Sequence, residues 1–401
     1  MDLQSGLPYP LIKNGLMYNY PGLEDSLEAE VVILGGGISG ALSAYYLSRA
    51  GIDCVVIDAR SIGLGSSCAS TSLLQYEIDV SLLELQKKVG YKNAVRSYEL
   101  CGQSILKLQD IAGDIGFKDF QMKNSLYYAV SKKHISFLKE EFKIRRENDF
   151  EVTFLERDSI KSEYGFDAHA AILSELGGQT NAYAFAHMLH QYNLRNGCKI
   201  FDHTKIIKIK HSADGVLLKT ENNQIVKAKK LLYATGYEAV NFVDKKIVDL
   251  HSTYVTTSEH TSTGKIFWKD DVLIWNTGNP YMYMRTTPDG RIIVGGRDEK
   301  FYDPGKRDKL IDQKAKDLKK DFNKLFPAIE FKPEYNWTGT FGATKDGLPF
   351  IGPYKSLPNS FFSLGFGGNG ITFSLIAAEI ITDLILGKDS SDAKIFAFER
   401  V

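Results

Sequence analysis

The sequence has no excess of charge of either sign. Its 401 residues include 49 lysines and arginines and 49 aspartates and glutamates, so the formal net charge at pH 7 is zero. A protein that mainly binds nucleic acid or an anionic membrane surface usually carries a basic excess. The charge balance therefore argues against both kinds of partner.

Long apolar runs and a leader-like N-terminus are also missing. The only long apolar stretch near a terminus, 371–386, contains Glu379 and Asp383, so we expect a packed helix and not a membrane span. Residues 1–30 lack a basic segment followed by an apolar run and small residues. We therefore expect a cytoplasmic protein.

Cysteines are few. Cys54, Cys68, Cys101 and Cys198 are scattered without the spacing of metal ligands, so we predict no metal site. Cys54 falls in an apolar run and is expected in the core.

At this length the chain is too long for one core, and we expect two intertwined domains.

A glycine-rich motif follows the apolar run 31–34. Gly35, Gly37 and Gly40 form the pattern G-x-G-x-x-G, and a helix-like segment begins after them. Such glycines allow a tight turn, a close approach of backbone N–H groups to a pyrophosphate, and close packing of helix against strand. The pyrophosphate would then lie at the N-terminus of the helix, beside Ile38 and Ser39.

A second apolar run, 54–57, ends in Asp58. This acidic residue lies eighteen positions after Gly40, which is the spacing at which a carboxylate meets an adenosine ribose. Together the two runs, the helix and Asp58 predict a dinucleotide site. From these residues alone, the dinucleotide can be either NAD or FAD.

Two further segments favour FAD. A predicted strand runs into the small turn Ala234-Thr235-Gly236, where backbone can pack against the adenosine half of a cofactor. The glycines of 365–370 leave room for a flat ring against bare backbone, and the helix predicted at 371–386 begins there. The positive end of that helix would face whatever the glycines contact.

Together these motifs, with 339–352, resemble the D-amino-acid oxidase-like FAD-dependent oxidoreductases, a group that includes glycine oxidase, sarcosine oxidase and gamma-glutamylputrescine oxidase. The resemblance runs from about residue 30 to the C-terminus. It implies an α/β fold, with a Rossmann-type, glutathione-reductase-like FAD-binding domain interleaved with an α+β substrate domain on a mostly antiparallel sheet. The implied ranges are 30–92, 166–238 and 336–401 for the FAD-binding domain, 93–165 and 239–335 for the substrate domain, and 1–29 for an N-terminal extension.

The resemblance also implies which residues bind FAD. In the family, the segment at 65–73 passes beneath the pyrophosphate and reaches the flavin, and the backbone at Ile206 would flank the adenine. The predicted cofactor-binding residues are Gly35, Gly37, Ile38, Ser39, Gly40, Asp58, Ala59, Arg60, Gly65, Ser66, Ser67, Ser70, Thr71, Ser72, Leu73, Ile206, Ala234, Thr235, Gly236, Gly342, Gly367, Gly368, Asn369, Gly370, Ile371 and Thr372. Sarcosine oxidase-like members tether the flavin through a cysteine shortly before the segment matching 344–346. No cysteine stands there, so we predict non-covalent FAD.

Candidate substrate residues come from a predicted hairpin at 279–297. Tyr281, Tyr283 and Arg285 alternate along its first strand and therefore share a face. If that face looks into the active site, Arg285 could hold a substrate carboxylate while the tyrosines form a wall. Alternatively, Arg285 pairs with an acid across the sheet.

One departure from the family bears on the substrate. Glycine oxidase-like members carry a carboxylate-binding arginine where this chain has Phe341 and Gly342, so either Arg285 replaces it or the substrate is an amine. Sarcosine oxidase-like members also place an oxygen-activating lysine where this chain aligns Ile293. We therefore leave the acceptor open, as oxygen or another compound, and make no prediction of the oligomer.

The resemblance implies oxidation of the C–N bond of an amine or amino acid. Hydride passes to flavin N5, and the imine product is then hydrolysed. Two alternatives remain at this point: a dehydrogenase of the same fold with a non-oxygen acceptor, and a non-catalytic flavin-binding subunit.

Overall fold

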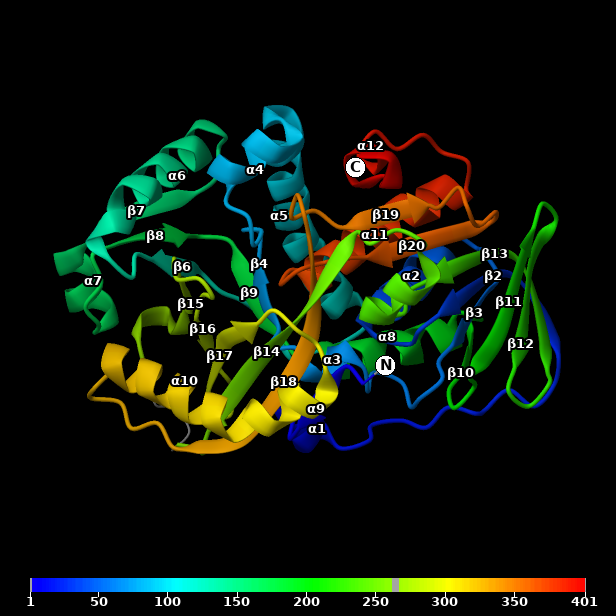
Figure 1. Cartoon of the computed structure of the whole chain (residues 1–401), viewed down its shortest axis with the longest axis horizontal. Coiled ribbons are helices and arrows are strands. Elements are labelled where there is room, and N and C mark those ends of the chain that lie inside the picture. Colours follow the sequence, from blue (N-terminus) through cyan, green and yellow to red (C-terminus); the bar gives the residue numbers. More distant parts are fainter. Residues whose placement is uncertain (1, 262–266, 401) are drawn as a thin grey trace.

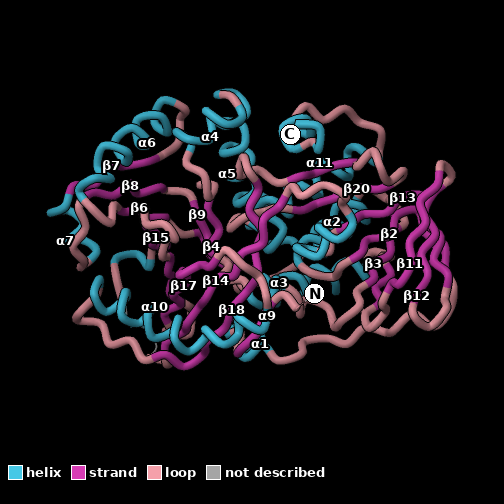
Figure 2. Tube along the Cα trace, in the orientation of Figure 1, coloured by secondary structure: helices cyan, strands magenta, loops and turns pink. Residues whose placement is uncertain are grey.

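Two large sheets dominate the fold and lie beside one another (Figures 1 and 2). The structure is a computed structural model and describes residues 2–261 and 267–400. One sheet has eight strands and the other has nine, and the chain passes between them several times. This arrangement confirms the predicted α/β class with interleaved units.

The eight-stranded sheet carries the dinucleotide motif. Its central strands β2 and β3 are parallel and almost wholly buried, as expected for apolar runs covered on both faces. The strands in spatial order are β10 (Lys199–Phe201), β3 (Cys54–Ile57), β2 (Leu27–Leu34), β13 (Ile225–Tyr233), β12 (Gly215–Thr220) and β11 (Ile206–Ser212). In addition, β20 (Ser360–Leu364) pairs with β13, and β19 (Phe350–Pro353) pairs with β20.

Four helices form a buried layer beside this sheet. The largest hydrophobic cluster is built from their apolar faces and from alternate residues of β2 and β3. Helix α2 packs against both α8 and α11, and α11 also packs against α5. Their bounds are α2 (Ile38–Arg49), α5 (Tyr91–Asp114), α8 (Ala182–Arg195) and α11 (Gly370–Ile385).

The nine-stranded sheet is antiparallel except for the parallel pair β15–β6. Its order is β1 (Gln4–Gly6), β18 (Pro333–Thr344), β14 (Val248–Ser258), β17 (Ile292–Glu299), β16 (Tyr283–Thr286), β15 (Leu273–Asn276), β6 (Ser125–Tyr128), β8 (Ala170–Ser174) and β7 (Val152–Glu156). Helix α10 (Ile311–Leu325) buries Ala315, Leu318 and Phe322 against β14, β17 and β18. Helices α6 (Ile135–Glu147) and α7 (Arg157–Tyr164) cover β7 and β8.

Shorter elements connect these layers. A small sheet is formed by β4 (Leu73–Gln75), β9 (Gly177–Thr180) and β5 (Phe120–Met122). The short helices are α1 (Tyr9–Asn14), α3 (Ser66–Ala69), α4 (Leu82–Val89), α9 (Pro304–Arg307) and α12 (Ala393–Phe396). The 3-10 turns are η1 (Lys132–His134), η2 (Gly236–Phe242), η3 (Lys269–Asp271), η4 (Asp308–Leu310) and η5 (Phe398–Arg400). Within the described residues, no helix has the length and apolar character that a membrane crossing requires.

Strand pairing differs from the predicted domain ranges in three places. Strands β8 and β18 belong to the nine-stranded sheet, although 166–174 and 336–344 were assigned to the FAD-binding domain. The N-terminal segment is not a separate extension, because β1 pairs with β18 and α1 contacts α3 and α8. These boundaries depend on which strands pair with one another. The paired strands lie far apart in the sequence, so local sequence patterns do not predict the pairing. The remaining boundaries stay predictions.

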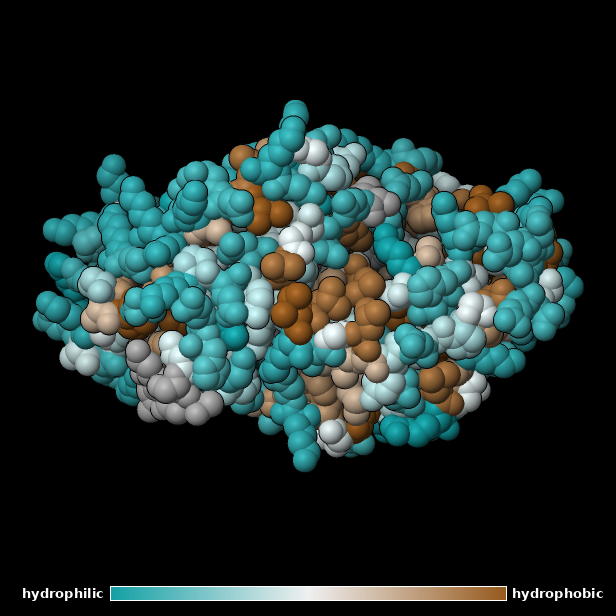
Figure 3. Space-filling model, turned by 90° about the horizontal axis from the view of Figure 1, so that it is seen from below, coloured by the Kyte–Doolittle hydropathy of each residue, from teal (hydrophilic) through white to brown (hydrophobic). Residues whose placement is uncertain are grey.

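The N-terminal segment also exposes several apolar side chains. Leu7, Ile12, Leu16 and Tyr18 are exposed. Helix α1 lies on the lower side of the molecule in Figure 1, and the view from that side in Figure 3 shows apolar side chains gathered near its middle.

A fully buried ion cluster joins the segment after β4 to α6. Arg145 Nη1 lies 3.1 Å from Glu77 Oε1, and Arg145 Nε lies 2.8 Å from Glu141 Oε1, with all three side chains fully buried. Glu141 also accepts hydrogen bonds from the backbone N–H groups of Leu82 and Leu83, at the start of α4. The single guanidinium therefore compensates two buried carboxylates.

Replacing Arg145 by methionine is expected to destabilise the protein strongly. The change leaves two buried carboxylates without a cation, which costs about 3–5 kcal/mol. Chemical denaturation of the wild type and the variant measures this loss. Arg157→Met is the matched control, because Arg157 pairs with Asp167 at the surface and its loss is expected to cost at most about 1 kcal/mol. Equal effects of the two changes would contradict the importance of the buried cluster.

Candidate functional site

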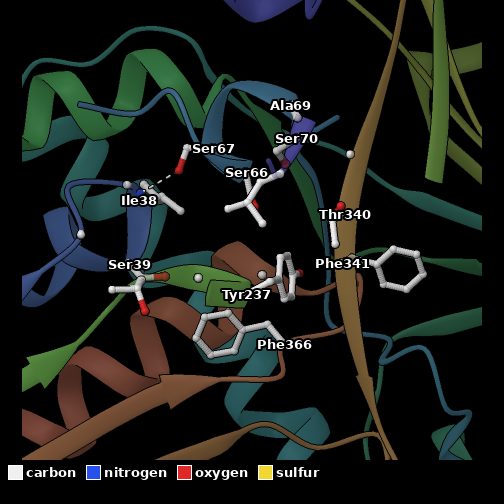
Figure 4. A pocket seen from close by; sticks show the side chains of 18 of the residues that line it. Ile38, Ser39, Ser66, Ser67, Ala69, Ser70, Tyr237, Thr340, Phe341 and Phe366 are labelled. Carbon is white, nitrogen blue, oxygen red and sulfur yellow. Dashed lines mark hydrogen bonds between the residues drawn. The ribbon is translucent and has the colours of Figure 1, made fainter. Parts of the chain in front are cut away.

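A cavity of about 430 Å³ runs from the ends of β2 and β3 to the nine-stranded sheet. Its walls come from segments that are far apart in the sequence. Figure 4 shows Ile38 and Ser39 from α2, Ser66, Ser67 and Ser70 from the segment around α3, and Phe341 from β18 around one space.

The glycine-rich motif forms one end of the cavity. Gly35 has a positive φ of 103°, and a Cβ atom there would lie 2.4 Å from the carbonyl oxygen of Ala234. A Cβ atom at Gly40 would lie 1.9 Å from the carbonyl oxygen of Gly35, so only glycine lets α2 start so close to β2. The positive end of α2 therefore faces the cavity, where it can bind an anion.

Asp58 lies beside this motif. Its Oδ2 accepts a hydrogen bond of 2.7 Å from the Gly36 N–H, and its Oδ1 accepts one of 2.9 Å from the Arg60 N–H. Burial raises the pKa of Asp58, while the two N–H donors act in the opposite direction. Arg60 in turn forms an ion pair with Glu238. Lys205 and Ile206 also line this end of the cavity, where the sequence analysis expects the adenosine of the cofactor.

Two buried hydroxyl groups on the cavity wall fit a bound dinucleotide. The side-chain oxygens of Ser66 and Thr235 are buried and have no hydrogen-bond partner in the protein. Ser67 Oγ, in contrast, accepts a hydrogen bond of 2.9 Å from the Ile38 N–H. Since buried polar groups are normally paired, the two unpaired hydroxyls fit a polar ligand such as FAD.

The other end of the cavity is lined by 366–372, just before and within the first turn of α11. Asn369 Nδ2 donates hydrogen bonds of 3.1 Å and 2.8 Å to the carbonyl oxygens of Gln75 and Glu77. Asp79 Oδ2 accepts a hydrogen bond of 2.6 Å from the Gly368 N–H. These bonds fix the glycine segment against the loop between β4 and α4.

Thr253, Tyr281, Tyr283 and Asp298 form a polar and aromatic wall at this end. The Tyr281 hydroxyl donates to Asp79 Oδ1 at 2.9 Å, and the rings of Tyr281 and Tyr283 have centroids 5.7 Å apart. Asp298 Oδ1 is buried and has no hydrogen-bond partner. Burial raises the pKa of Asp298 to about 6.

Most predicted cofactor residues line this cavity, with two exceptions. Gly40 lies behind the wall, where it serves the packing of α2 against β2. Gly342 also does not line the cavity, because its carbonyl oxygen accepts from the Gly367 N–H and its α-carbon faces the side chains of Tyr237 and Val248. Contact of the lining residues with FAD stays a prediction.

Arg285 does not lie where the sequence analysis expects it. It shares a face with Tyr283, but its guanidinium lies outside the cavity and donates to three backbone carbonyl oxygens. The distances are 2.6 Å to Thr71, 3.1 Å to Thr286 and 3.3 Å to Thr180. No acid among the described residues forms an ion pair with it, so the pairing across the sheet does not occur. Its position outside the cavity does not support the predicted carboxylate clamp. Burial lowers the pKa of Arg285 to about 10.

Several lining residues were not predicted. They are Leu3, Leu34, Ile57, Gly63, Ala69, Leu74, Gln75, Thr204, Lys205, Tyr237, Glu238, Asn241, Phe242, Thr253, Asp298, Gly339, Thr340, Phe341 and Phe366. A local signal existed for Asp298, which follows the apolar strand and the two glycines of the predicted hairpin. No such signal existed for Leu3, which reaches the cavity because β1 pairs with β18.

The glycine turn, the parallel strands and the helix that begins at the cavity define a dinucleotide-binding α/β protein. A family model described as "FAD dependent oxidoreductase" matches residues 30–384, so the chain belongs to that family. The predicted cofactor and enzyme class are thereby confirmed.

Known proteins of this family resemble the chain over nearly its whole length. Gamma-glutamylputrescine oxidoreductase of Escherichia coli (strain K12) is 24% identical, over 91% of this chain and 85% of that protein. Glycine oxidase of Bacillus subtilis (strain 168) is 22% identical, over 92% and 96%. Among solved structures, L-proline dehydrogenase from P. horikoshii has a TM-score of 0.77 at 18% identity and covers 94% of this chain and 99% of its own. Glycine oxidase from Geobacillus kaustophilus has a TM-score of 0.76 at 18% identity, with 91% and 96% covered.

Replacing Arg285 by methionine is expected to weaken retention of FAD. The change leaves the carbonyl oxygens of Thr71, Thr286 and Thr180 without this donor, at about 1–3 kcal/mol for each buried group, and loosens the segment that follows α3. The measurement is the flavin absorbance per protein after gel filtration. Arg49→Met, which removes an exposed arginine, should retain the wild-type amount. Full retention of FAD by the Arg285 variant would show that the three hydrogen bonds of the Arg285 guanidinium do not stabilise the site.

Proposed function

We propose that the chain oxidises the C–N bond of a small amine that carries no carboxylate next to the reacting carbon. The supporting observation is the charge along the cavity. Among the described lining residues, the only cations are Arg60 and Lys205, which lie at the end near Asp58. The opposite end presents Asp298 and two tyrosines, which suit an ammonium group and not a carboxylate.

FAD, when bound, accepts the hydride from the carbon that bears the amine. The chain holds the cofactor and the substrate in place and keeps water away. Gly35, Gly37 and Ser66 would hold the pyrophosphate, Asp58 the ribose, and the backbone of 367–372 the flavin. Tyr281 and Tyr283 would flank the substrate, whose imine product hydrolyses in water. The names of the relatives agree with amine or amino-acid substrates.

FAD is proposed to be bound without a covalent link. No cysteine occurs among the described lining residues. Cys68, in the segment around α3, donates to the Gly65 carbonyl oxygen, and burial raises the pKa of its thiol to about 12. Such a thiol is unreactive. All four cysteines are free, which supports the proposed cytoplasmic location.

An anaerobic absorbance screen tests the substrate class. The purified yellow protein is mixed with primary and secondary alkylamines, N-alkyl glycines, and L- and D-amino acids. We expect bleaching of the flavin by alkylamines, and by alpha-amino acids at a rate at least about tenfold lower, since a carboxylate near Asp298 would be repelled. Bleaching by alpha-amino acids alone would contradict the proposal. No bleaching by any compound would favour the non-catalytic subunit.

The same charge distribution bears on the electron acceptor. Oxygen accepts its first electron as superoxide, which a nearby cation stabilises and a nearby carboxylate destabilises. Asp79 and Asp298 lie at the proposed flavin end, and Ile293 is fully buried in a cluster with Val255 and Trp337. We therefore favour an acceptor other than oxygen.

Recolouring of the reduced protein in air checks this second proposal. We expect the flavin absorbance to return slowly in air-saturated buffer and at least about tenfold faster when a soluble quinone is added, because the charges do not favour superoxide. Return in air as fast as with the quinone would identify an oxidase. As a control, the flavin is reduced by dithionite in place of an amine. Its rates of reoxidation by air and by the quinone are then compared with no amine product present.

A further inference from the structure

We propose that Asp298 binds the ammonium group of the substrate and removes its proton, which leaves the neutral amine that hydride transfer requires. This inference rests on the proposed function, because it assigns a residue to an amine that enters as a cation. The Asp298 carboxylate lies on the cavity wall beside Tyr281 and Tyr283, at the end remote from Asp58.

Asp298 is the acid at this end that retains an unoccupied oxygen. Its Oδ1 is buried without a partner. Asp79, in contrast, uses Oδ1 for the Tyr281 hydroxyl and Oδ2 for the Gly368 N–H. Because Asp298 lines the cavity and its Oδ1 lacks a donor in the protein, this carboxylate is a binding position for a positively charged N–H group.

The neighbouring charged groups are already engaged with other partners. On the same strand, Glu299 pairs with Lys314 from α10 at 2.5 Å, and Arg297 pairs with Asp321 at 2.6 Å. Lys314 also donates to the Arg297 carbonyl oxygen. No ion pair with Asp298 occurs among the described residues, so the ammonium group of the substrate can be the cation that pairs with it.

Other titratable groups near Asp298 influence its pKa. Asp79, from the loop after β4, raises its pKa by like-charge repulsion, whereas Lys314 and the Thr253 hydroxyl lower it. Tyr281 and Tyr283 stay protonated, because burial raises their pKa values. Burial is the largest influence and raises the pKa of Asp298 to about 6. Asp298 is therefore an anion at neutral pH, but a more basic one than an ordinary aspartate.

The proton transfer is balanced within the site. The ammonium N–H bond breaks, its electron pair stays on nitrogen as the lone pair of the neutral amine, and the proton bonds to Asp298 Oδ1. A free alkylamine has a pKa near that of lysine, about 10.4, so only a small fraction is neutral at pH 7 in water. Tyr281 and Tyr283 can stabilise the cation before transfer through their ring faces.

The first test uses binding without turnover. Tetramethylammonium has no N–H bond and cannot form an imine, but it carries the charge that Asp298 should bind. Its affinity for the holoenzyme is measured by the shift of flavin absorbance between pH 5 and 8. We expect tighter binding above pH 6 and up to a tenfold loss per pH unit below it, since the carboxylate is then protonated. Binding in Asp298→Asn should be at least about tenfold weaker at pH 8 and independent of pH.

The second test follows the rate of flavin bleaching by the best amine as a function of pH. In the wild type, bleaching at low substrate concentration should rise through pH 6 and then level off. In Asp298→Asn it should be at least about a hundredfold slower at pH 7 and keep rising tenfold per pH unit toward the pKa of the amine, because only neutral amine can react. Rescue at high pH is not expected from a purely structural defect.

Asp167→Asn is the matched control, because Asp167 is an exposed acid that pairs with Arg157 and does not line the cavity. It should bind and react as the wild type does. Equal affinity of Asp298→Asn and wild type for tetramethylammonium at pH 8 would refute the assignment. If no amine bleaches the flavin but the pH-dependent binding is present, the proposed function fails while the cation site at Asp298 stands.

Discussion

The close approach of three backbone segments around Gly35 is the contact on which the site depends. The absence of side chains at Gly35 and Gly40 lets the start of α2 lie against β2, and it brings the end of β13 at Ala234 alongside. This contact aims the positive end of α2 at the cavity and sets the width of the space for a pyrophosphate. Any larger side chain would separate the helix from the strand and move Asp58 as well, because its carboxylate is bound by the backbone of Gly36.

The second half of the site is built differently. Its position depends on side-chain hydrogen bonds to backbone groups, such as those of Asn369, Asp79 and Arg285, and not on one compact motif. Behind this wall, the buried pair of Glu77 and Arg145 fixes the loop that carries Asp79. The cations of the cavity wall, Arg60 and Lys205, lie with Asp58 and Glu238 at one end, whereas Asp298 lines the other end without a cation. Under the proposed function, this difference favours a cationic substrate at the end where it disfavours superoxide.

The strands, helices and turns of the dinucleotide motif could be predicted from the sequence because their signals are local. The strand at 54–57 and the helix at 371–386 have clear patterns, and the turns at Gly35 and Gly236 require glycine, with positive φ angles in both. The part of the cavity proposed to bind the substrate depends on which strands pair and on which side chains share a face of the sheet. Alternation correctly placed Arg285 on the face of Tyr283, but the position of Thr71 beside it depends on contacts far apart in the chain. The position of Asp298 after two glycines is a local signal, but it does not reveal a role for the residue, because its neighbours Thr253, Tyr281 and Asp79 come from three other segments.

The wall of the cavity contains Leu3 from one end of the sequence and Ile371 and Thr372 from near the other. Leu3 lies next to β1, which pairs with β18 and therefore can take its place only after β18 has been made. During synthesis on the ribosome, the glycine motif at 35–40 is made long before residues 366–372, which line the opposite end of the cavity. The wall of the site is therefore incomplete until those residues have been made. Until α11 has been made, the apolar side chains of α2 that pack against it have no cover, and such uncovered apolar surface promotes aggregation.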